Sequence, residues 1–108
     1  MSASPPRHRL IVIPWLRRPA QRWILPNWLA ITIGPFILAW RALDAVELAH
    51  ELAHVRQWRQ HGLLYPLRYW RSSQAAQARG LDRYRENEFE IEARAAEEVA
   101  RAGLNTPV

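Results

Sequence analysis

The chain has 108 residues, a length typical of one domain, and carries a formal net charge of +5. It contains no cysteine, which excludes disulfides, a thiolate nucleophile and every cysteine-based metal site. It also contains no lysine, which excludes a lysine Schiff base and a P-loop. Its arginines are spread from Arg7 to Arg101 and do not form one block, so a nucleic-acid partner is not favoured.

The N-terminal residues do not have the pattern of a secretory signal. Their apolar run, 10–13, ends at Pro14 and is too short for the hydrophobic region of a signal peptide. We therefore expect a cytoplasmic protein. Residues 1–108 are predicted to form one domain, in which 1–9 and 103–108 are loose ends.

The stretch 23–40 is nearly devoid of polar side chains and is about as long as a membrane span. Several of its residues disfavour a membrane helix and suit turns: Pro26, Asn27, Gly34 and Pro35. Short strands are instead predicted at 10–13, 22–25, 29–33 and 36–40, separated by turns at 14–19, 26–27 and 34–35. They would form a small, mostly antiparallel N-terminal sheet. A membrane-attached interaction protein, with 23–40 inserted, is an alternative interpretation.

From Asp44 the pattern becomes that of a helix. Asp44 is a good N-cap, Glu47 stands at the capping-box position, and Gly62 supplies the stop. Residues 63–70 are aromatic and interrupted by proline, and 72–80 read as a polar connection that we expect to be mobile.

A last helix is predicted to start near Asn87, whose side chain would cap Glu90, and to end at about Ala102, before Gly103. A sheet followed by helices gives an α+β fold.

The sequence His-Glu-Leu-Ala-His at 50–54 is the main functional signal. His50 and His54 lie one turn apart on the same helix face, so both imidazoles can reach one tetrahedral Zn²⁺. Glu51 lies about 100° round the helix and can approach a water on that metal without binding the metal itself. The pattern predicts a zinc site with Glu51 as a general base. A non-catalytic zinc-binding domain is the alternative.

Two stretches of the chain, HELAHVRQ at 50–57 and NEFEIEA at 87–93, resemble zinc metallopeptidases of the zincin tribe. The resemblance is closest to small bacterial gluzincin-like proteins, the minigluzincins. It implies a minimal zincin-like fold, in which a sheet precedes the HExxH helix and a glutamate helix follows it. It also implies hydrolysis of peptide bonds in a peptide or protein substrate.

The position of the third zinc ligand differs between zincin patterns. The metzincin pattern is excluded because Gln57 and Gln60 stand where it requires glycine and histidine. The gluzincin pattern, a glutamate followed three residues later by alanine, matches Glu90, with Glu88 and Glu92 as alternatives. Two features weaken the match. Arg94 replaces an aspartate that steadies a ligating histidine in many gluzincins, and the helical wheel places Glu90 on a charged stripe typical of a solvent-facing side.

The resemblance assigns Glu51 the roles of base and then acid. A donor must also stabilise the tetrahedral intermediate, and Tyr84 is our candidate, with Tyr65, Tyr69 or an arginine as alternatives. An extended substrate could pair with an exposed strand, 31–33 or 36–40. Trp58, Tyr65 and Trp70 are candidate pocket walls. The sequence does not predict the oligomeric state.

Overall fold

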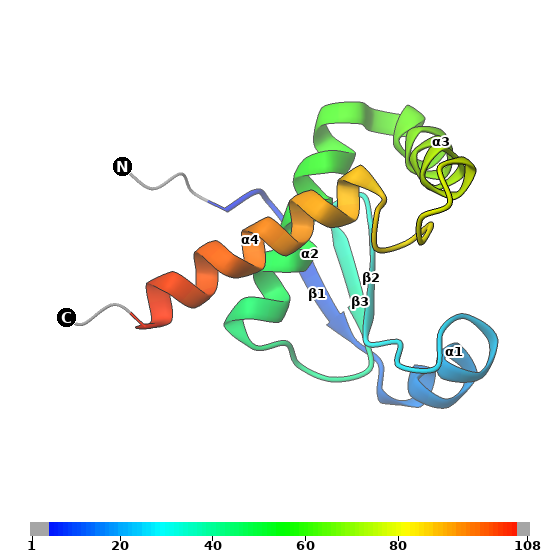
Figure 1. The fold of residues 1–108 in the computed structure, drawn as a ribbon. Helices are drawn as coiled ribbons and strands as arrows, with labels where there is room; N and C mark the ends of the chain where they lie inside the picture. The colour runs from blue at the N-terminus through cyan, green and yellow to red at the C-terminus, as the bar shows by residue number, and fades with distance from the viewer. Residues whose placement is uncertain (1–4, 106–108) are drawn as a thin grey trace.

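The computed structural model of the chain describes residues 5–105 and has an α+β fold (Figure 1). Its elements in chain order are β1 (Arg9–Val12), the 3-10 turn η1 (Pro14–Leu16), α1 (Arg17–Trp23), β2 (Ala30–Ile33), β3 (Phe36–Ala39), α2 (Ala45–His61), the 3-10 turn η2 (Gly62–Leu64), α3 (Tyr65–Ala78) and α4 (Glu88–Asn105). Of the ends predicted to be loose, 1–9 and 103–108, the residues 1–4 and 106–108 lie outside the described part of the chain. Arg9 belongs to β1 and 103–105 belong to α4.

The sheet is mixed, which corrects the prediction of a mostly antiparallel one. Its strand order is β1-β3-β2, with β3 antiparallel to β2 and parallel to β1. Gly34 and Pro35 join β2 to β3 in a tight turn, and Gly34 has a φ of +61° that favours glycine. The hairpin places β3 between β1 and β2, with β3 running in the same direction as β1. β2 is therefore an edge strand.

The predicted strand at 22–25 is wrong. Residues up to Trp23 belong to α1, and Ile24 and Leu25 follow it without strand pairing. The apolar run resembles a strand, but the residues before it favour helix, and Pro19 falls in the first turn of α1 where its missing N–H is harmless. Among residues 5–105 no helix is long and apolar enough to cross a bilayer.

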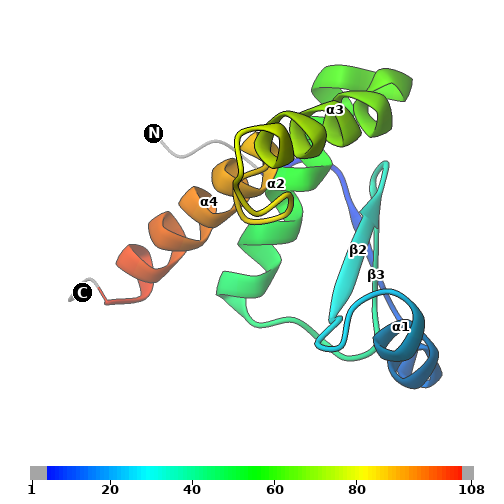
Figure 2. The ribbon, with the colours of Figure 1, turned by 45° about the vertical axis from the view of Figure 1, so that its right-hand side comes forward.

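Helix α2 has the ends that the sequence predicts. The Asp44 carboxylate accepts from the Glu47 N–H at 2.7 Å, and the Glu47 carboxylate accepts from the Asp44 N–H at 3.0 Å, which completes the capping box. Gly62 stops the helix with a φ of +63°. In Figure 2, α2 lies between the sheet and α4, so its two sides are covered by different partners.

Residues 65–78 form helix α3, whereas the sequence predicted no helix at 63–70, an aromatic segment interrupted by proline, and a mobile connection at 72–80. Pro66 lies within the first turn of α3 and therefore breaks no helical hydrogen bond. Tertiary contacts hold α3 in place: Asn87 Nδ2 donates to the Tyr69 carbonyl and to Ser73 Oγ, each at 2.9 Å. These contacts are not visible in local sequence.

Helix α4 begins where predicted and ends later. The side-chain oxygen Oδ1 of Asn87 accepts a hydrogen bond from the Phe89 N–H at 2.8 Å, whereas the predicted donor was the next residue, Glu90. The helix continues past Gly103 to Asn105. Its buried face, which includes Phe89 and Ala93, packs on α2, and this packing carries Glu90 to the histidines of α2.

Candidate metal centre

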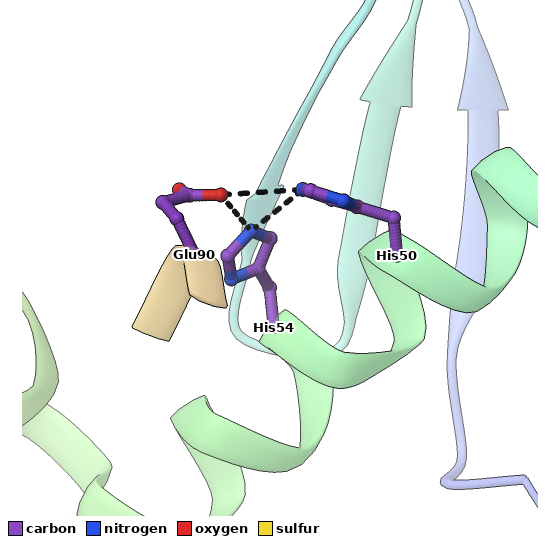
Figure 3. Close-up of side chains that lie close together, drawn as sticks. All are labelled: His50, His54 and Glu90. Carbon is purple, nitrogen blue, oxygen red and sulfur yellow. Dashed lines mark hydrogen bonds and ion pairs between the residues drawn. The ribbon is translucent and has the colours of Figure 1, made fainter. Parts of the chain in front are cut away.

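Three side chains from two helices converge at the centre of the molecule. His50 and His54 project from successive turns of α2, and Glu90 projects from the first turn of α4 (Figure 3). Glu90 Oε1 lies 3.2 Å from His50 Nε2 and 3.1 Å from His54 Nε2, and the two Nε2 atoms are 3.3 Å apart. The three atoms form a nearly equilateral triangle, and they are a group that could hold a metal ion.

The size of this triangle fits a tetrahedral ion. Zinc bonds of about 2.0–2.1 Å to nitrogen and oxygen separate neighbouring ligand atoms by about 3.3–3.4 Å. The observed separations of 3.1–3.3 Å are close to that spacing. The cluster offers three ligand atoms, from two imidazoles and one carboxylate. Catalytic zinc sites take three ligands from the protein, with water or substrate as the fourth.

The structure selects Glu90 among the glutamates that the sequence offered. Glu90 is only 4% exposed, although its place on a charged stripe predicted a solvent-facing side chain. Glu88 is exposed, and Glu92 accepts a hydrogen bond from Gln57 Nε2 at 3.0 Å. Arg94 does not pair with Glu90, since its guanidinium donates to the carbonyl of Arg85.

Gln57 holds the ring of His54. Gln57 Nε2 donates to the Phe89 carbonyl at 2.9 Å and to Glu92, which fixes the orientation of the amide. Gln57 Oε1 therefore faces His54 Nδ1 at 2.8 Å and also accepts from the Tyr65 hydroxyl at 2.6 Å. An acceptor at this position holds a proton on Nδ1 of His54. Nε2 is therefore the nitrogen that faces Glu90 and His50 and that could bind a metal ion once it gives up its own proton.

The two carboxylate oxygens of Glu90 have different partners. Tyr69 donates to Oε2 at 2.6 Å, which leaves Oε1 for the histidines. Burial acts to raise the pKa of Glu90, but hydrogen bonds from His50, His54 and Tyr69 outweigh it and hold this pKa well below its usual value. Burial acts to lower the pKa of His54, and here too the neighbouring Glu90 carboxylate prevails, so the pKa is raised. Glu90 is thus an anion at neutral pH, as a metal ligand must be.

His50 has a carboxylate behind it as well. Its Nδ1 lies 3.7 Å from Oε1 of Glu97, two turns after Glu90 on the same side of α4. Both histidines therefore have an oxygen on the side away from the triangle: Gln57 Oε1 at hydrogen-bond distance from His54, and Glu97 Oε1 at the longer distance of an ion pair from His50. Such acceptors orient metal-binding imidazoles and raise their basicity.

Glu51 lies beside the triangle without belonging to it. Its side chain is buried, and Thr32 Oγ1 on β2 donates to Glu51 Oε2 at 3.0 Å. Burial raises the pKa of Glu51 above its ordinary value, against the opposing effects of His54, His50 and the Thr32 hydrogen bond. A carboxylate with a raised pKa exchanges protons more readily near neutral pH than an exposed one.

A cleft of about 400 Å³ opens onto these groups. The triangle and Glu51 form its polar part, and most of the remaining lining is apolar or aromatic: Ile24, Leu25, Trp28, Ala30, Ile31, Thr32, Trp58, Tyr65, Pro66, Tyr69 and Tyr84. Two of the three predicted walls, Trp58 and Tyr65, are present. Trp70 is not among the lining residues and is 55% exposed on α3.

The tyrosines differ in their exposure. The hydroxyls of Tyr65 and Tyr69 are bonded to Gln57 and Glu90 inside the cleft, whereas Tyr84 is partly exposed there and also interacts with Glu90. Burial, with the nearby carboxylates of Glu90 and Glu51, raises the pKa of Tyr84 to about 12. Tyr84 therefore keeps its proton at neutral pH and can donate. Its role in stabilising an intermediate stays a prediction.

Three residues around the cluster have no predicted role in the sequence: Thr32, Gln57 and Glu97. Gln57 argues only against the metzincin pattern there, yet it follows His54 by three residues and so shares its helix face. Glu97 follows Glu90 by seven residues, again on one face. Thr32 carried no local signal, because its contact with Glu51 joins a strand to a helix.

Comparisons with known proteins do not assign the chain to a family. No model of a protein family, no curated protein and no solved structure matches it. We therefore infer its function from the geometry of the cluster and the cleft.

Proposed function

We propose that this chain is a zinc-dependent metallopeptidase. The observation that supports this function best is the position of Glu51, a carboxylate held by Thr32 in the same cleft as the His50, His54 and Glu90 triangle but outside it. A purely structural zinc site has closed coordination and no use for such a carboxylate. The resemblance of the HELAH and NEFEIEA stretches to gluzincin-like proteins is further support.

His50, His54 and Glu90 would hold the zinc ion, through Nε2, Nε2 and Oε1. When bound, zinc supplies a Lewis acid that polarises a carbonyl and makes water nucleophilic near neutral pH. Zinc is favoured over Mg²⁺ and Ca²⁺ because two of the three ligand atoms are imidazole nitrogens, and those ions prefer oxygen.

In this proposal Glu51 takes a proton from the attacking water and delivers it to the amine that leaves. The hydrogen bond from Thr32 occupies Oε2 of Glu51 and so orients the carboxylate. Tyr84 is the proposed donor to the carbonyl oxygen of the substrate, because its hydroxyl stays protonated and lies at the cleft.

An extended peptide is the proposed substrate. The edge strand β2 contributes Ala30, Ile31 and Thr32 to the lining, and an edge strand can pair with a peptide backbone. The other predicted candidate, 36–40, is wrong because β3 is paired on both sides. The mostly apolar lining favours an apolar side chain next to the cleaved bond.

Metal content tests the site separately from the activity. We expect about one equivalent of zinc in the purified wild-type chain, measured by mass spectrometry of the elements, and almost none in His54→Ala. His8→Ala is the matched control, because His8 contacts the Pro6 carbonyl and lies outside the cluster. Equal zinc in wild type and His54→Ala would refute the site.

Hydrolysis is tested with a library of internally quenched peptides. Glu51→Gln should keep zinc and fold but lose at least about a hundredfold in rate, since general-base catalysis contributes roughly 10²–10⁴-fold. Glu98→Gln, on the exposed side of α4, should retain full activity. Absence of cleavage by the zinc-loaded wild type, or undiminished cleavage by Glu51→Gln, would favour a non-catalytic zinc-binding domain.

A further inference from the structure

Residues 14–25, which comprise η1, α1 and the two residues after it, project from one end of the sheet (Figure 2). We call this segment the tryptophan loop. Four of its large apolar side chains are exposed: Trp15 at 72%, Trp23 at 77%, Ile24 at 60% and Leu25 at 42%. These four side chains fall within twelve consecutive residues, and exposed apolar side chains gathered in one segment often mark a surface that binds a partner.

The tryptophan loop is also cationic. It carries Arg17, Arg18 and Arg22, and these side chains form none of the ion pairs found among residues 5–105. The guanidinium of Arg22 lies 5.3 Å from the ring centre of the exposed Trp23, so charge and aromatic surface are presented together.

Charge is divided unevenly along the chain. Residues 1–43 contain six arginines and no acidic residue, whereas residues 44–108 contain nine arginines and all ten acidic residues. The net charges are therefore +6 and −1, which sum to the overall +5. The tryptophan loop lies in the half that has no acidic side chain to neutralise it.

We propose that the tryptophan loop docks the chain on the surface of an anionic lipid bilayer. Tryptophan is suited to the boundary between headgroups and acyl chains, and Ile24 and Leu25 gain free energy by entering the acyl region. Arginines beside them are attracted by anionic headgroups. The chain would bind the surface without crossing it.

Two other occupants fit these residues less well. A nucleic acid would neutralise the arginines and stack on the indoles, but the aliphatic side chains of Ile24 and Leu25 gain little from it. A second copy of the chain joined through this loop would bring Arg17, Arg18 and Arg22 against their own equivalents, which costs free energy.

Docking would place the metal cleft at the lipid surface, because Ile24 and Leu25 belong to both the tryptophan loop and the lining of the cleft. The proposal concerns lipid binding alone. It can therefore hold or fail independently of peptide hydrolysis.

The test is sedimentation of the full chain with vesicles at physiological ionic strength. One set of vesicles contains phosphatidylcholine alone and the other equal parts of phosphatidylcholine and phosphatidylserine. We expect binding to the second set. The double variant Trp15→Ala, Trp23→Ala should bind about tenfold more weakly. Replacing Arg17, Arg18 and Arg22 with glutamine should weaken binding roughly fivefold per arginine.

Matched controls use side chains of the same kind on other surfaces. Trp70→Ala removes an exposed tryptophan of α3, and glutamine at Arg59, Arg79 and Arg83 removes three exposed charges. Both should bind vesicles as the wild type does. All variants change exposed residues, and circular dichroism with thermal melting checks that each is folded.

Three outcomes would overturn the proposal. The first is that the wild-type chain does not bind the anionic vesicles, or that the control variants lose binding as much as the loop variants do. The second is binding to a short single-stranded oligonucleotide, lost in the loop variants, with no binding to vesicles. The third is self-association in sedimentation velocity that the loop variants abolish, again with no binding to vesicles.

Discussion

The side-chain amide of Gln57 fixes the ring of His54, with Gln57 Oε1 2.8 Å from His54 Nδ1. The amide cannot turn over without losing two hydrogen bonds, because its Nε2 donates to the Phe89 carbonyl and to Glu92 on α4. A residue outside the HExxH sequence thus orients the His54 ring and ties α2 to α4 at the same point.

Replacement of Gln57 should weaken metal binding. We expect Gln57→Leu to lower zinc affinity about 10–100-fold, because His54 would lose the acceptor that orients it. The measurement is competition with a chromophoric chelator. Gln60→Leu, at an exposed position of the same helix, is the control and should bind zinc like the wild type. Equal affinities of Gln57→Leu and wild type would show that the amide does not orient the ligand.

Zinc should stabilise the fold, since its proposed ligands come from two helices that are far apart in sequence. At free zinc one hundred times the dissociation constant, the stabilisation is about 2.7 kcal/mol, which raises the melting temperature by about 10 °C or more in a chain of this size. Differential scanning calorimetry with and without a chelator measures this shift.

His50→Ala should abolish the zinc-dependent shift, and His8→Ala should keep it. A shift of the same size in His50→Ala would mean that zinc stabilises the chain from a different site.

Loss of the Thr32 hydroxyl should lower the rate of peptide hydrolysis and leave the zinc content unchanged. Thr32→Val keeps the shape of the side chain but removes the hydrogen bond to Glu51 Oε2. We expect a fall in kcat of about tenfold, the cost of a loosely held general base, with unchanged zinc content. Thr32→Ser restores the donor and should recover most of the rate. If Thr32→Val and Thr32→Ser are equally active, the hydroxyl has no part in positioning Glu51.

The ion pair at the start of α2 should make stability depend on pH. Arg41 donates to both carboxylate oxygens of Glu47 at 2.8 Å, and this hydrogen bonding lowers the pKa of Glu47 from 4.5 to about 2. A lowered pKa in the folded state means that the stabilisation is complete above the unfolded pKa. It is lost as the pH falls from about 4.5 to about 2.

Glu47→Gln should therefore destabilise the chain at neutral pH by on the order of 1 kcal/mol, a value reduced for the partial exposure of both partners. The difference from wild type should shrink below pH 4.5 and disappear near pH 2. Urea unfolding at a series of pH values measures it, with Glu98→Gln as a control for the loss of a surface carboxylate. A difference that does not change with pH would contradict the ion pair.

Local sequence determined those parts of the molecule that depend on neighbours along the chain. The capping box of Asp44 and Glu47 and the glycine stop at Gly62 set the ends of α2, as predicted. The four-residue spacing of His50 and His54 places both imidazoles on one face of that helix. The β2–β3 hairpin was also predicted, because a glycine-proline turn joins two short apolar runs.

Tertiary structure alone decided the features that depend on distant segments. Insertion of β3 made the sheet mixed, and contacts of Asn87 hold α3 where a mobile connection was predicted at 72–80. The packing of α4 on α2 buried Glu90 against the histidines, although its charged stripe suggested a solvent-facing side chain. Helical periodicity gives the direction of each side chain about its own axis, but only the docking of one element on another decides which directions meet.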